Sequence, residues 1–354
     1  MGVREATPEE IISALEPTIG DEVEFYVHQM ERRGLGTLAL NYADLTPLSS
    51  FEQMGDDYQG IVDKWAEQGI DITPLVYSLL YTNGLTEENL PRYSEQLHYG
   101  FAHFRSEPLD YWRGLWNGSE QQHGPTITRV VEATGAVDLA GEYIPAMTGN
   151  MIKGIHPNIG TPQDGFAYLT PQELATRIAH QFTEQILSGQ AAMAIGEVRQ
   201  DEALHYMFYR KMLAKSAEMF PDETLMAIQR QFLGFDMPGR DGIKDFNKHS
   251  MYIAAAGAFD NEKTLKMFHD ILKAVKLTDL TPKTDEGKAA QESLMVFTDL
   301  SSEPHQQAKA EDQKIRERLA SRKAWQPKSG LNNFVLGATV EYDDDAGEYR
   351  AIAA

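Results

Sequence analysis

The stretch Asp201-Glu202-Ala203-Leu204-His205 lies in the middle of a helix that we predict from Gly189 to Lys215. Glu202 and His205 are three residues apart, so a helix projects both side chains from the same face. The members of that face are Ile195, Val198, Glu202, His205, Tyr209 and Met212. Because burial of an unpaired carboxylate costs free energy, a glutamate within an apolar face requires a metal ion or a partner. The spacing therefore predicts an iron or manganese ion held between helices.

The Glu-x-x-His spacing occurs three times in the chain, as Glu95-His98, Glu120-His123 and Glu202-His205. A single copy is a weak indication of a metal site, because short motifs arise by chance. The pair at 120–123 lies on the apolar face of a helix predicted from Pro108 to Ala133. The pair at 95–98 lies on the polar side of a helix predicted from Thr86 to Phe104, so we expect it at the surface.

A di-metal carboxylate site also needs one glutamate from each of two further helices. On the helix from Thr86, periodicity places Glu87 on the apolar face and Glu88 on the polar face. A helix predicted from Thr170 to Leu187 supplies Glu173. The chain then reads Glu followed about thirty residues later by Glu-x-x-His, and it does so twice. This doubled order predicts a site that four helices build together.

Both single glutamates also have an explanation without metal. Thr170-Pro171-Gln172-Glu173 fits a capping box, and Glu87 fits the first turn of a helix, where the helix dipole favours a carboxylate. Together, however, the four carboxylates balance two divalent cations, which favours the metal site. Oxygen ligands with two imidazoles match iron or manganese and leave positions open for dioxygen. Asp201 is interpreted either as a hydrogen-bond partner of a ligand histidine or as a solvated carboxylate, and His180 as a core histidine.

Composition limits the compartment and the partners. The 354 residues include 42% hydrophobic residues and no cysteine, so a large core is possible and any metal must use histidine and carboxylate. The formal net charge of −21 argues against nucleic acid and anionic membranes as general partners. No apolar run reaches the length of a membrane span, and the start of the chain lacks a signal-peptide pattern, so we expect a cytoplasmic protein.

The rest of the chain reads as helices joined by loops, with no alternating strand pattern. Thr7-Pro8 and Thr73-Pro74 begin two early helices, and the glycines between Gly55 and Gly69 are expected to interrupt the helical pattern. Further helices are predicted over residues 144–152, 221–233, 247–258, 261–275 and 284–322. We predict an all-α fold in one domain over residues 1–325, followed by an acidic extension over residues 326–354.

The segments around the predicted ligands follow a recognisable pattern. Trp116-Asn117-Gly118-Ser119-Glu120-Gln121-Gln122-His123-Gly124 surrounds one pair, and residues 201–205 hold the other. Accompanying segments are Thr86-Glu87-Glu88-Asn89-Leu90-Pro91, Gln172-Glu173-Leu174-Ala175-Thr176, Phe235-Asp236-Met237-Pro238-Gly239 and Glu286-Gly287-Lys288-Ala289-Ala290-Gln291. The first segment resembles the Trp-x-Ala-Glu-Glu-Asn-Arg-His-Gly segment of soluble acyl-ACP desaturases, and the others are also similar to segments of that family. The resemblance covers about residues 10 to 335 and is closer to the actinobacterial branch than to the plant one.

This resemblance implies a ferritin-like helical bundle with additional helices, a homodimer and a di-iron centre. It also implies electrons from a ferredoxin-type donor and a saturated acyl chain on acyl carrier protein, into which dioxygen chemistry introduces a cis double bond during fatty acid biosynthesis. The implied iron ligands are Glu87, Glu120, His123, Glu173, Glu202 and His205. Thr176 corresponds to a threonine near the oxygen-binding face, and Trp116 and Asp201 correspond to residues with structural or electron-transfer roles.

The sequence departs from the family pattern around the first pair, where Ser119, Gln121 and Gln122 replace Glu, Asn and Arg. Two alternative functions therefore stay open. One is a di-iron oxygenase or hydroxylase acting on a specialised carrier-bound chain, and the other is an iron oxidase or storage protein without an acyl substrate. An apolar channel beside the metals would argue against the latter.

The negative charge of the chain raises a question about its carrier. Acyl carrier proteins are acidic, so a chain with a net charge of −21 needs basic residues gathered where a carrier docks. Arg210, Lys211 and Lys215 follow the Glu202-His205 pair on the same predicted helix. We expect these three residues to form the docking cluster.

Overall fold

The computed structural model describes residues 6–33, 48–69, 71–91, 94, 106–153, 159–237, 240, 242–321, 338–343 and 348–353. The α-helices are α1 (Pro8–Arg32), α2 (Leu48–Glu67), α3 (Thr73–Glu88), α5 (Glu107–Thr134), α6 (Ile144–Lys153), α7 (Pro162–Ile186), α8 (Gly189–Met219), α9 (Pro221–Leu233), α10 (Phe246–Ala255), α11 (Asn261–Ala274), α12 (Asp285–Met295) and α13 (Glu303–Ser321). Two strands, β1 (Ala338–Asp343) and β2 (Glu348–Ala353), pair antiparallel.

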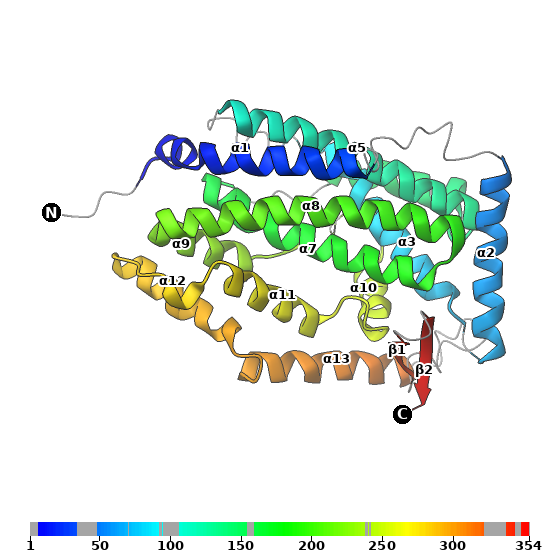
Figure 1. Ribbon diagram of the computed structural model, residues 1–354. Coiled ribbons are helices and arrows are strands. Elements are labelled where there is room, and N and C mark those ends of the chain that lie inside the picture. The colour runs from blue at the N-terminus through cyan, green and yellow to red at the C-terminus, as the bar shows by residue number, and fades with distance from the viewer. Residues whose placement is uncertain are drawn as a thin grey trace.

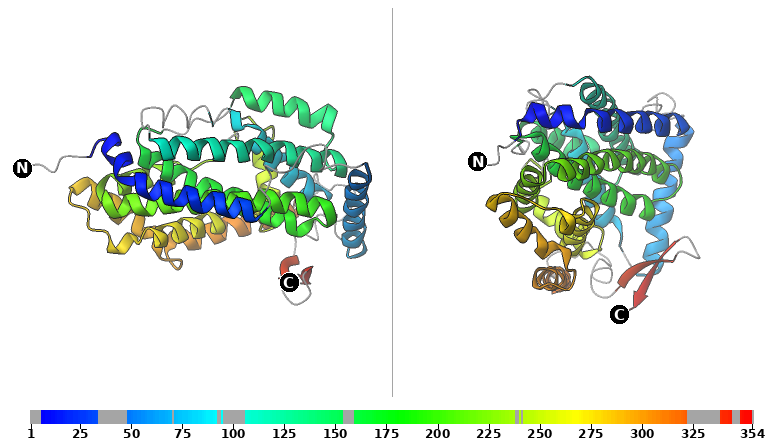
Figure 2. Two further views of the ribbon diagram at one scale, coloured as in Figure 1. Left: turned by 45° about the horizontal axis from the view of Figure 1, so that its top comes forward. Right: turned by 60° about the vertical axis from the view of Figure 1, so that its left-hand side comes forward.

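Four helices, α3, α5, α7 and α8, form a bundle at the centre of the molecule (Figure 1). α3 and α8 each pack against both α5 and α7. α1 lies along α5 and α8, and α2 stands across one end of the bundle (Figure 1; Figure 2). On the opposite side α10 packs against α3, while α9 and α11 pack against α7. This arrangement confirms the predicted all-α fold and buries the faces that the four central helices turn toward one another.

Local sequence signals fix the ends of several helices. At α1 the Thr7 hydroxyl accepts a hydrogen bond from the Glu10 N–H, and the Glu10 carboxylate accepts one from the Thr7 N–H, which is the predicted helix start. Ser106 caps α5, and Gly135 ends it with a φ of 63°. The face of α8 predicted from the sequence is at most 4% exposed throughout: Ile195, Val198, Glu202, His205, Tyr209 and Met212.

The helix predicted to begin at Thr86 is wrong at its start, because α3 begins at Thr73 and continues to Glu88. α3 passes through Gly84, where an added Cβ would overlap the hydroxyl of Tyr143. That glycine marks a close packing contact rather than a turn. Most side chains of α3 are buried, so the helix has no polar face that would reveal its period. Glu87 therefore lies in the last turn of a helix, where the dipole does not favour a carboxylate.

The start of α7 also differs from the prediction. Thr161 is its cap and accepts a hydrogen bond from the Asp164 N–H, so the helix begins at Pro162 rather than at Thr170. The Thr170 hydroxyl donates instead to the Phe166 carbonyl, and Pro171 lies inside the helix. Glu173 consequently sits well within α7, and the capping-box explanation for it is wrong.

Three further expectations need correction. α2 runs through Gly55 and Gly60, so the glycines do not interrupt it. At Gly55 an added Cβ would lie only 3.1 Å from the Ala133 carbonyl oxygen, which explains the missing side chain. The segment 284–322 is divided into α12 and α13 by a 3-10 turn at Val296–Thr298. The strand pair shows that the last residues contain regular structure that the sequence pattern did not indicate.

No helix among the described residues is both long enough and apolar enough to cross a membrane.

Candidate metal centre

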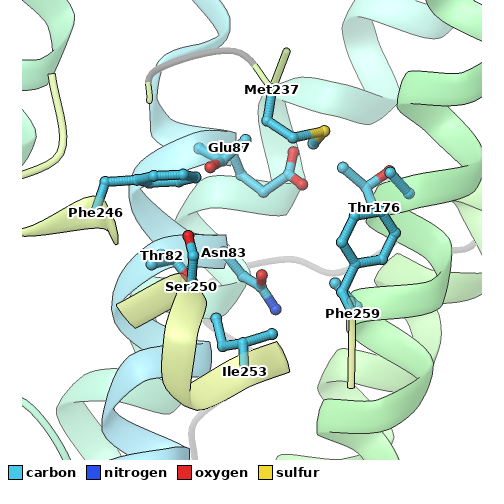
Figure 3. Close-up of a pocket in the computed structure, with 12 residues that line it drawn as sticks. Thr82, Asn83, Glu87, Thr176, Met237, Phe246, Ser250, Ile253 and Phe259 are labelled. Atoms are coloured by element: carbon cyan, nitrogen blue, oxygen red, sulfur yellow. The ribbon is translucent and has the colours of Figure 1, made fainter. Parts of the chain in front are cut away.

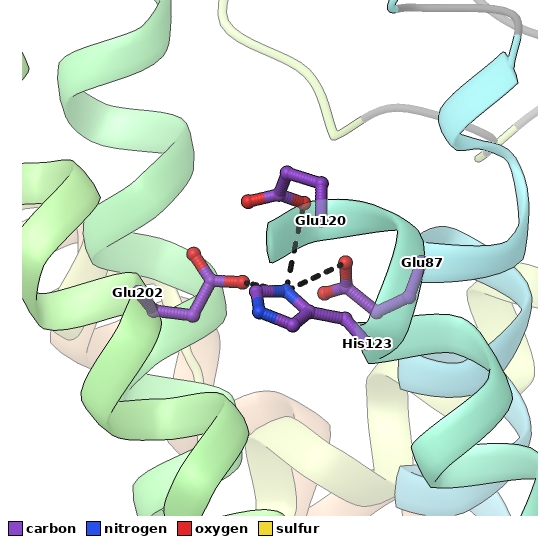
Figure 4. Close-up of side chains that lie close together, drawn as sticks. All are labelled: Glu87, Glu120, His123 and Glu202. Atoms are coloured by element: carbon purple, nitrogen blue, oxygen red, sulfur yellow. Dashed lines mark ion pairs between the residues drawn. The ribbon is translucent and has the colours of Figure 1, made fainter. Parts of the chain in front are cut away.

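A first group of possible metal ligands comprises Glu87, Glu120, His123 and Glu202, whose ligand atoms all lie within 4.8 Å of one another (Figure 4). His123 is at the centre of the group. Its Nδ1 atom is 3.1 Å from Glu202 Oε1, 3.5 Å from Glu120 Oε2 and 3.8 Å from Glu87 Oε2. Carboxylate oxygens around one imidazole nitrogen are a donor set suited to iron or manganese.

A second group comprises Glu120, Glu173, Glu202 and His205, within the same limit of 4.8 Å. The Nδ1 atom of His205 is 2.8 Å from Glu120 Oε1 and 3.5 Å from Glu173 Oε2. Glu120 and Glu202 belong to both groups, whereas each group has its own histidine and its own further glutamate. Two metal positions that share two carboxylates fit this arrangement.

Each of the four central helices contributes to the two groups. α3 supplies Glu87 and α7 supplies Glu173, while α5 and α8 each supply one Glu-x-x-His pair. The i, i+3 spacing turns the glutamate and the histidine of a pair toward the same interior. All six side chains are at most 2% exposed: Glu87, Glu120, His123, Glu173, Glu202 and His205. The structure thus brings together all six residues that the sequence singled out, and their role as ligands stays a prediction.

Burial and mutual charge shift the proton affinities of these groups. Burial and the neighbouring carboxylates Glu202 and Glu120 raise the pKa of Glu173 well above its ordinary value. For Glu120, burial acts in the same direction, but contacts with His123 and His205 prevail and lower its pKa to about 2. Burial opposes protonation of His123, yet Glu120 and the other carboxylates raise the pKa of this imidazole well above its ordinary value. The site therefore concentrates negative charge, and the raised proton affinity of Glu173 and His123 partly compensates for that charge.

The polar atoms of the site fit two divalent cations. Several of these atoms are buried and have no hydrogen-bond partner among the described residues: Glu120 Oε1, His123 Nδ1, Glu173 Oε2, Glu202 Oε1 and Oε2, and His205 Nδ1. A buried polar atom without a hydrogen-bond partner costs free energy. The clustering of these atoms in one place therefore indicates a ligand. Four carboxylates would neutralise two divalent cations, and cations would stabilise the ionised form of Glu173.

Neighbouring side chains support the six residues. Trp116 Nε1 donates a 3.0 Å hydrogen bond to Glu173 Oε1. Asp201 Oδ2 lies 3.5 Å from His123 Nε2, on the side of the imidazole that faces away from the carboxylates. His180 Nε2 lies 3.1 Å from Glu87 Oε1, so this buried histidine contacts a predicted ligand rather than only filling the core. Its spacing of seven residues from Glu173, two helical turns, was the available signal.

An apolar-walled pocket that is partly open to solvent lies beside the first group (Figure 3). The pocket is lined by Thr82, Asn83, Thr86, Glu87, Ala175, Thr176, Ala179, Met237, Phe246, Ser250, Ile253 and Phe259. Glu87 and Met237 lie toward one end of it, and Ile253 and Phe259 toward the other. α3, α7 and α10 provide most of the wall. Thr176, predicted near the oxygen-binding face, is part of this wall.

The other candidate glutamates are placed differently. Glu88 is half-buried and accepts a 2.8 Å hydrogen bond from the Thr128 hydroxyl, so it does not belong to either ligand group. The Glu95-His98 pair lies outside the described residues, and its surface position stays a prediction.

A sequence model of the fatty acid desaturase family matches residues 8–326. The chain belongs to the fatty acid desaturase family.

Individual relatives agree with this membership. The chain is 24% identical over 247 residues to DesA1 of Mycobacterium tuberculosis, named as an acyl-[acyl-carrier-protein] desaturase, with 67% of this chain and 72% of DesA1 covered. It is 29% identical over 262 residues to the chloroplastic stearoyl-[acyl-carrier-protein] 9-desaturase 2 of Oryza sativa, with 68% and 64% covered. The X-ray structure of the acyl-ACP desaturase DesA2 from M. tuberculosis matches with a TM-score of 0.51 at 17% identity, covering 79% of this chain and 98% of DesA2. That structure supports the fold of this family member.

Metal binding to the metal-free protein is expected to release protons. The raised pKa values of His123 and of Glu173 shift both groups toward the protonated form, and a metal ligand must be deprotonated. Binding should therefore release about one or more protons per chain and should tighten as pH rises through these pKa values. Calorimetric titration with Co²⁺ at one pH in buffers of different ionisation enthalpy measures the number released. Proton uptake, or no buffer dependence, would contradict the assignment.

Proposed function

We propose that this protein is an acyl-[acyl-carrier-protein] desaturase that introduces a cis double bond into a carrier-bound saturated acyl chain. The observation that carries the proposal is the position of Glu87, which belongs to the first ligand group and also to the wall of the pocket. An acyl chain in this pocket would bring its methylenes next to a metal ligand. The names of the DesA1 and rice relatives support this substrate class. A storage protein or an iron oxidase without an organic substrate has no use for such a pocket.

The cofactor in this proposal is a pair of iron ions. Glu87 and His123 would hold one ion, Glu173 and His205 the other, and Glu120 and Glu202 would contact both. When bound, the irons supply the activation of dioxygen and the removal of hydrogen from unactivated C–H bonds. In the balanced reaction the acyl chain loses two hydrogen atoms, and one dioxygen molecule is reduced to two water molecules. Two electrons from a ferredoxin-type donor and two protons complete the balance.

The residues of the chain position the substrate and keep water away from it. Buried apolar walls from α3, α7 and α10 favour an extended hydrocarbon over water. The Thr176 hydroxyl lies on the wall within 3.1 Å of the Glu173 carbonyl oxygen, to which it donates, so the helix itself fixes its position. The Trp116 indole holds Glu173 in place by its hydrogen bond, and Trp116 is not among the residues that line the pocket.

The carrier-docking cluster expected from the sequence stays a prediction, and both of its lysines have acidic neighbours. Lys211 forms an ion pair of 2.7 Å with Glu22, and Lys215 forms one of 3.0 Å with Glu218. Arg210 lies over the ring of Tyr206, and Arg177 on α7 lies within the charge influence of both Arg210 and Arg199 on α8, an arrangement that the sequence did not indicate. Burial and the charges of Arg199 and Arg210 lower the pKa of Arg177. Arg199 is itself paired with Glu184, so Arg177 and Arg210 are the further candidates for contact with an acidic carrier beside the lysines.

The proposal also includes a homodimer, a main domain over residues 1–325 and an acidic extension over residues 326–354. These parts rest on the family resemblance and on composition.

The decisive experiment is mass spectrometry of acyl-carrier-protein substrates after aerobic incubation with the iron-loaded protein, a ferredoxin and a reductant. A panel of saturated chain lengths should include one that loses two hydrogens, with a cis double bond at a defined position. A gain of one oxygen instead would identify a hydroxylase, the alternative that the replaced residues around Glu120 leave open. If no acyl chain in the panel changes while the protein still oxidises iron, the oxidase or storage function would be favoured and the proposal contradicted.

A further inference from the structure

Arg33 connects the end of α1 to the metal-bearing helix α8. It is the residue directly after α1, and its side chain is 17% exposed. Its Nη1 atom donates a 2.7 Å hydrogen bond to Asp201 Oδ1, and its Nη2 atom donates to Glu197 Oε2 at 2.9 Å and to the Glu197 carbonyl at 3.3 Å. These contacts join two segments 168 residues apart in the chain and hold the guanidinium in one orientation.

Asp201 is the group that Arg33 holds. Its side chain is 0% exposed, so its charge needs compensation within the protein. Arg33 binds one carboxylate oxygen, while the other accepts a 3.2 Å hydrogen bond from the Ser119 hydroxyl and lies 3.5 Å from His123 Nε2. The Asp201 carboxylate is thus fixed by α1 and α5 and faces the back of a predicted metal ligand.

The consequence concerns the imidazole of His123. With a carboxylate facing Nε2, the proton of the neutral ring resides on Nε2, and the lone pair of Nδ1 faces Glu87, Glu120 and Glu202. A carboxylate that could rotate would not specify this tautomer or ring orientation. Arg33 and Ser119 both restrict that rotation, and of the two only Arg33 also supplies a positive charge to the buried carboxylate.

The second ligand histidine has no equivalent support. The ring nitrogens of both histidines lack a hydrogen bond among the described residues, but Asp201 lies 3.5 Å from His123 Nε2, whereas the ion pairs of His205 with described carboxylates involve only its Nδ1 atom. The nearest candidate from α1 is Tyr26, whose ring stacks at 6.0 Å from the His205 ring and whose hydroxyl likewise has no such partner there. The two halves of the site therefore differ in what stands behind their imidazoles.

We propose that Arg33 is a positioning residue for the metal position of Glu87 and His123, acting through Asp201. The proposal rests on the di-metal site described above. It predicts that the two metal positions are unequal and that Arg33 controls the affinity of only one of them. Loss of the outer carboxylate behind a ligand histidine typically weakens metal binding about 10- to 100-fold.

The test is a Co²⁺ titration of the metal-free full chain, followed by the visible absorbance of the bound ion and by the bound stoichiometry. The parent protein should bind two Co²⁺ ions. Arg33→Gln should bind one ion as the parent does and the other about 10- to 100-fold more weakly. Arg33→Lys, which keeps a positive donor for Asp201, should recover most of the loss. Lys211→Gln is the matched control, because it removes another ion pair between α1 and α8, with Glu22, away from the ligands.

A second variant tests whether Arg33 acts through Asp201. Asp201→Asn should weaken the same Co²⁺ position, and the double variant should be no weaker than Asp201→Asn alone. Additive losses in the double variant, or two parent-like sites in Arg33→Gln, would overturn the role of Arg33 and leave the proposed function standing. A parent protein that binds no Co²⁺ pair would overturn both. If Arg33→Gln lowers the thermal stability of the metal-free chain, the comparison with Arg33→Lys decides between a folding defect and positioning.

Discussion

Replacement of Glu202 by alanine should abolish binding of both metal ions and lower the rate of acyl-chain oxidation at least about 10³-fold. Glu202 belongs to both ligand groups, so its loss removes an oxygen donor from each position. Catalysis by bound metal contributes several kcal/mol of transition-state stabilisation, which corresponds to a factor of this size. The measurement is iron content per chain after reconstitution, together with product formation from acyl carrier protein substrates. Glu120→Ala should behave in the same way, because Glu120 is also shared.

Two control variants sharpen this prediction. Glu88→Ala changes the residue next to Glu87 and removes a hydrogen bond from Thr128, but Glu88 belongs to neither ligand group, so two ions should remain. Glu95→Ala should also retain both ions, because we assign the Glu95-His98 pair to the surface. Metal loss in Glu95→Ala with metal retention in Glu202→Ala would mean that the wrong Glu-x-x-His pair had been assigned to the site.

Filling the pocket should separate substrate binding from metal binding. Ala179 lies on the pocket wall on α7, so Ala179→Phe would place a ring where the acyl chain is proposed to lie. We expect kcat/KM for acyl carrier protein substrates to fall at least about 100-fold, since small displacements of a substrate from reactive geometry cost this much. The iron content should stay at the parent value, because Ala179 belongs to neither ligand group.

Gln181→Phe is the matched control for the pocket variant. Gln181 is exposed on the same helix and does not line the pocket, so the same ring there should leave kcat/KM near that of the parent. Parent-like turnover by Ala179→Phe across the whole panel of chain lengths would place the acyl site elsewhere.

The sequence predicted which six side chains come together better than it predicted the helices that carry them. α8 was recognisable because apolar residues recur at helical spacing on one face while charged residues such as Arg199 and Lys211 lie off that face. α3 was misplaced because it is buried on most sides and shows no clear helical period, although Glu87 was still assigned to the interior. The two metal groups were predictable because ligand chemistry restricts residue types and spacing more tightly than packing does.

What the sequence could not indicate were contacts made by the fold alone. Arg33 and Asp201 are 168 residues apart, and no local motif marks Arg33 as part of the site. The ion pairs of Lys211 and Lys215 likewise depend on which glutamate the fold or the side-chain rotamer brings near. The spacing of His180 from Glu173 places both on one face of α7. Its contact with Glu87 depends on where α3 ends, which the sequence did not indicate.

α1 carries none of the six predicted ligands, yet Arg33 at its end holds Asp201, Tyr26 stacks on His205 and Glu22 pairs with Lys211. A protein engineer who excised only the four ligand-bearing helices as a miniature oxygen-activating scaffold would retain every donor atom. This four-helix fragment would nevertheless lack the Arg33 charge that orients the His123 imidazole and the Tyr26 ring that stacks on His205. The smallest transplantable unit of this centre therefore has five helices, and α1 belongs in any redesign of it.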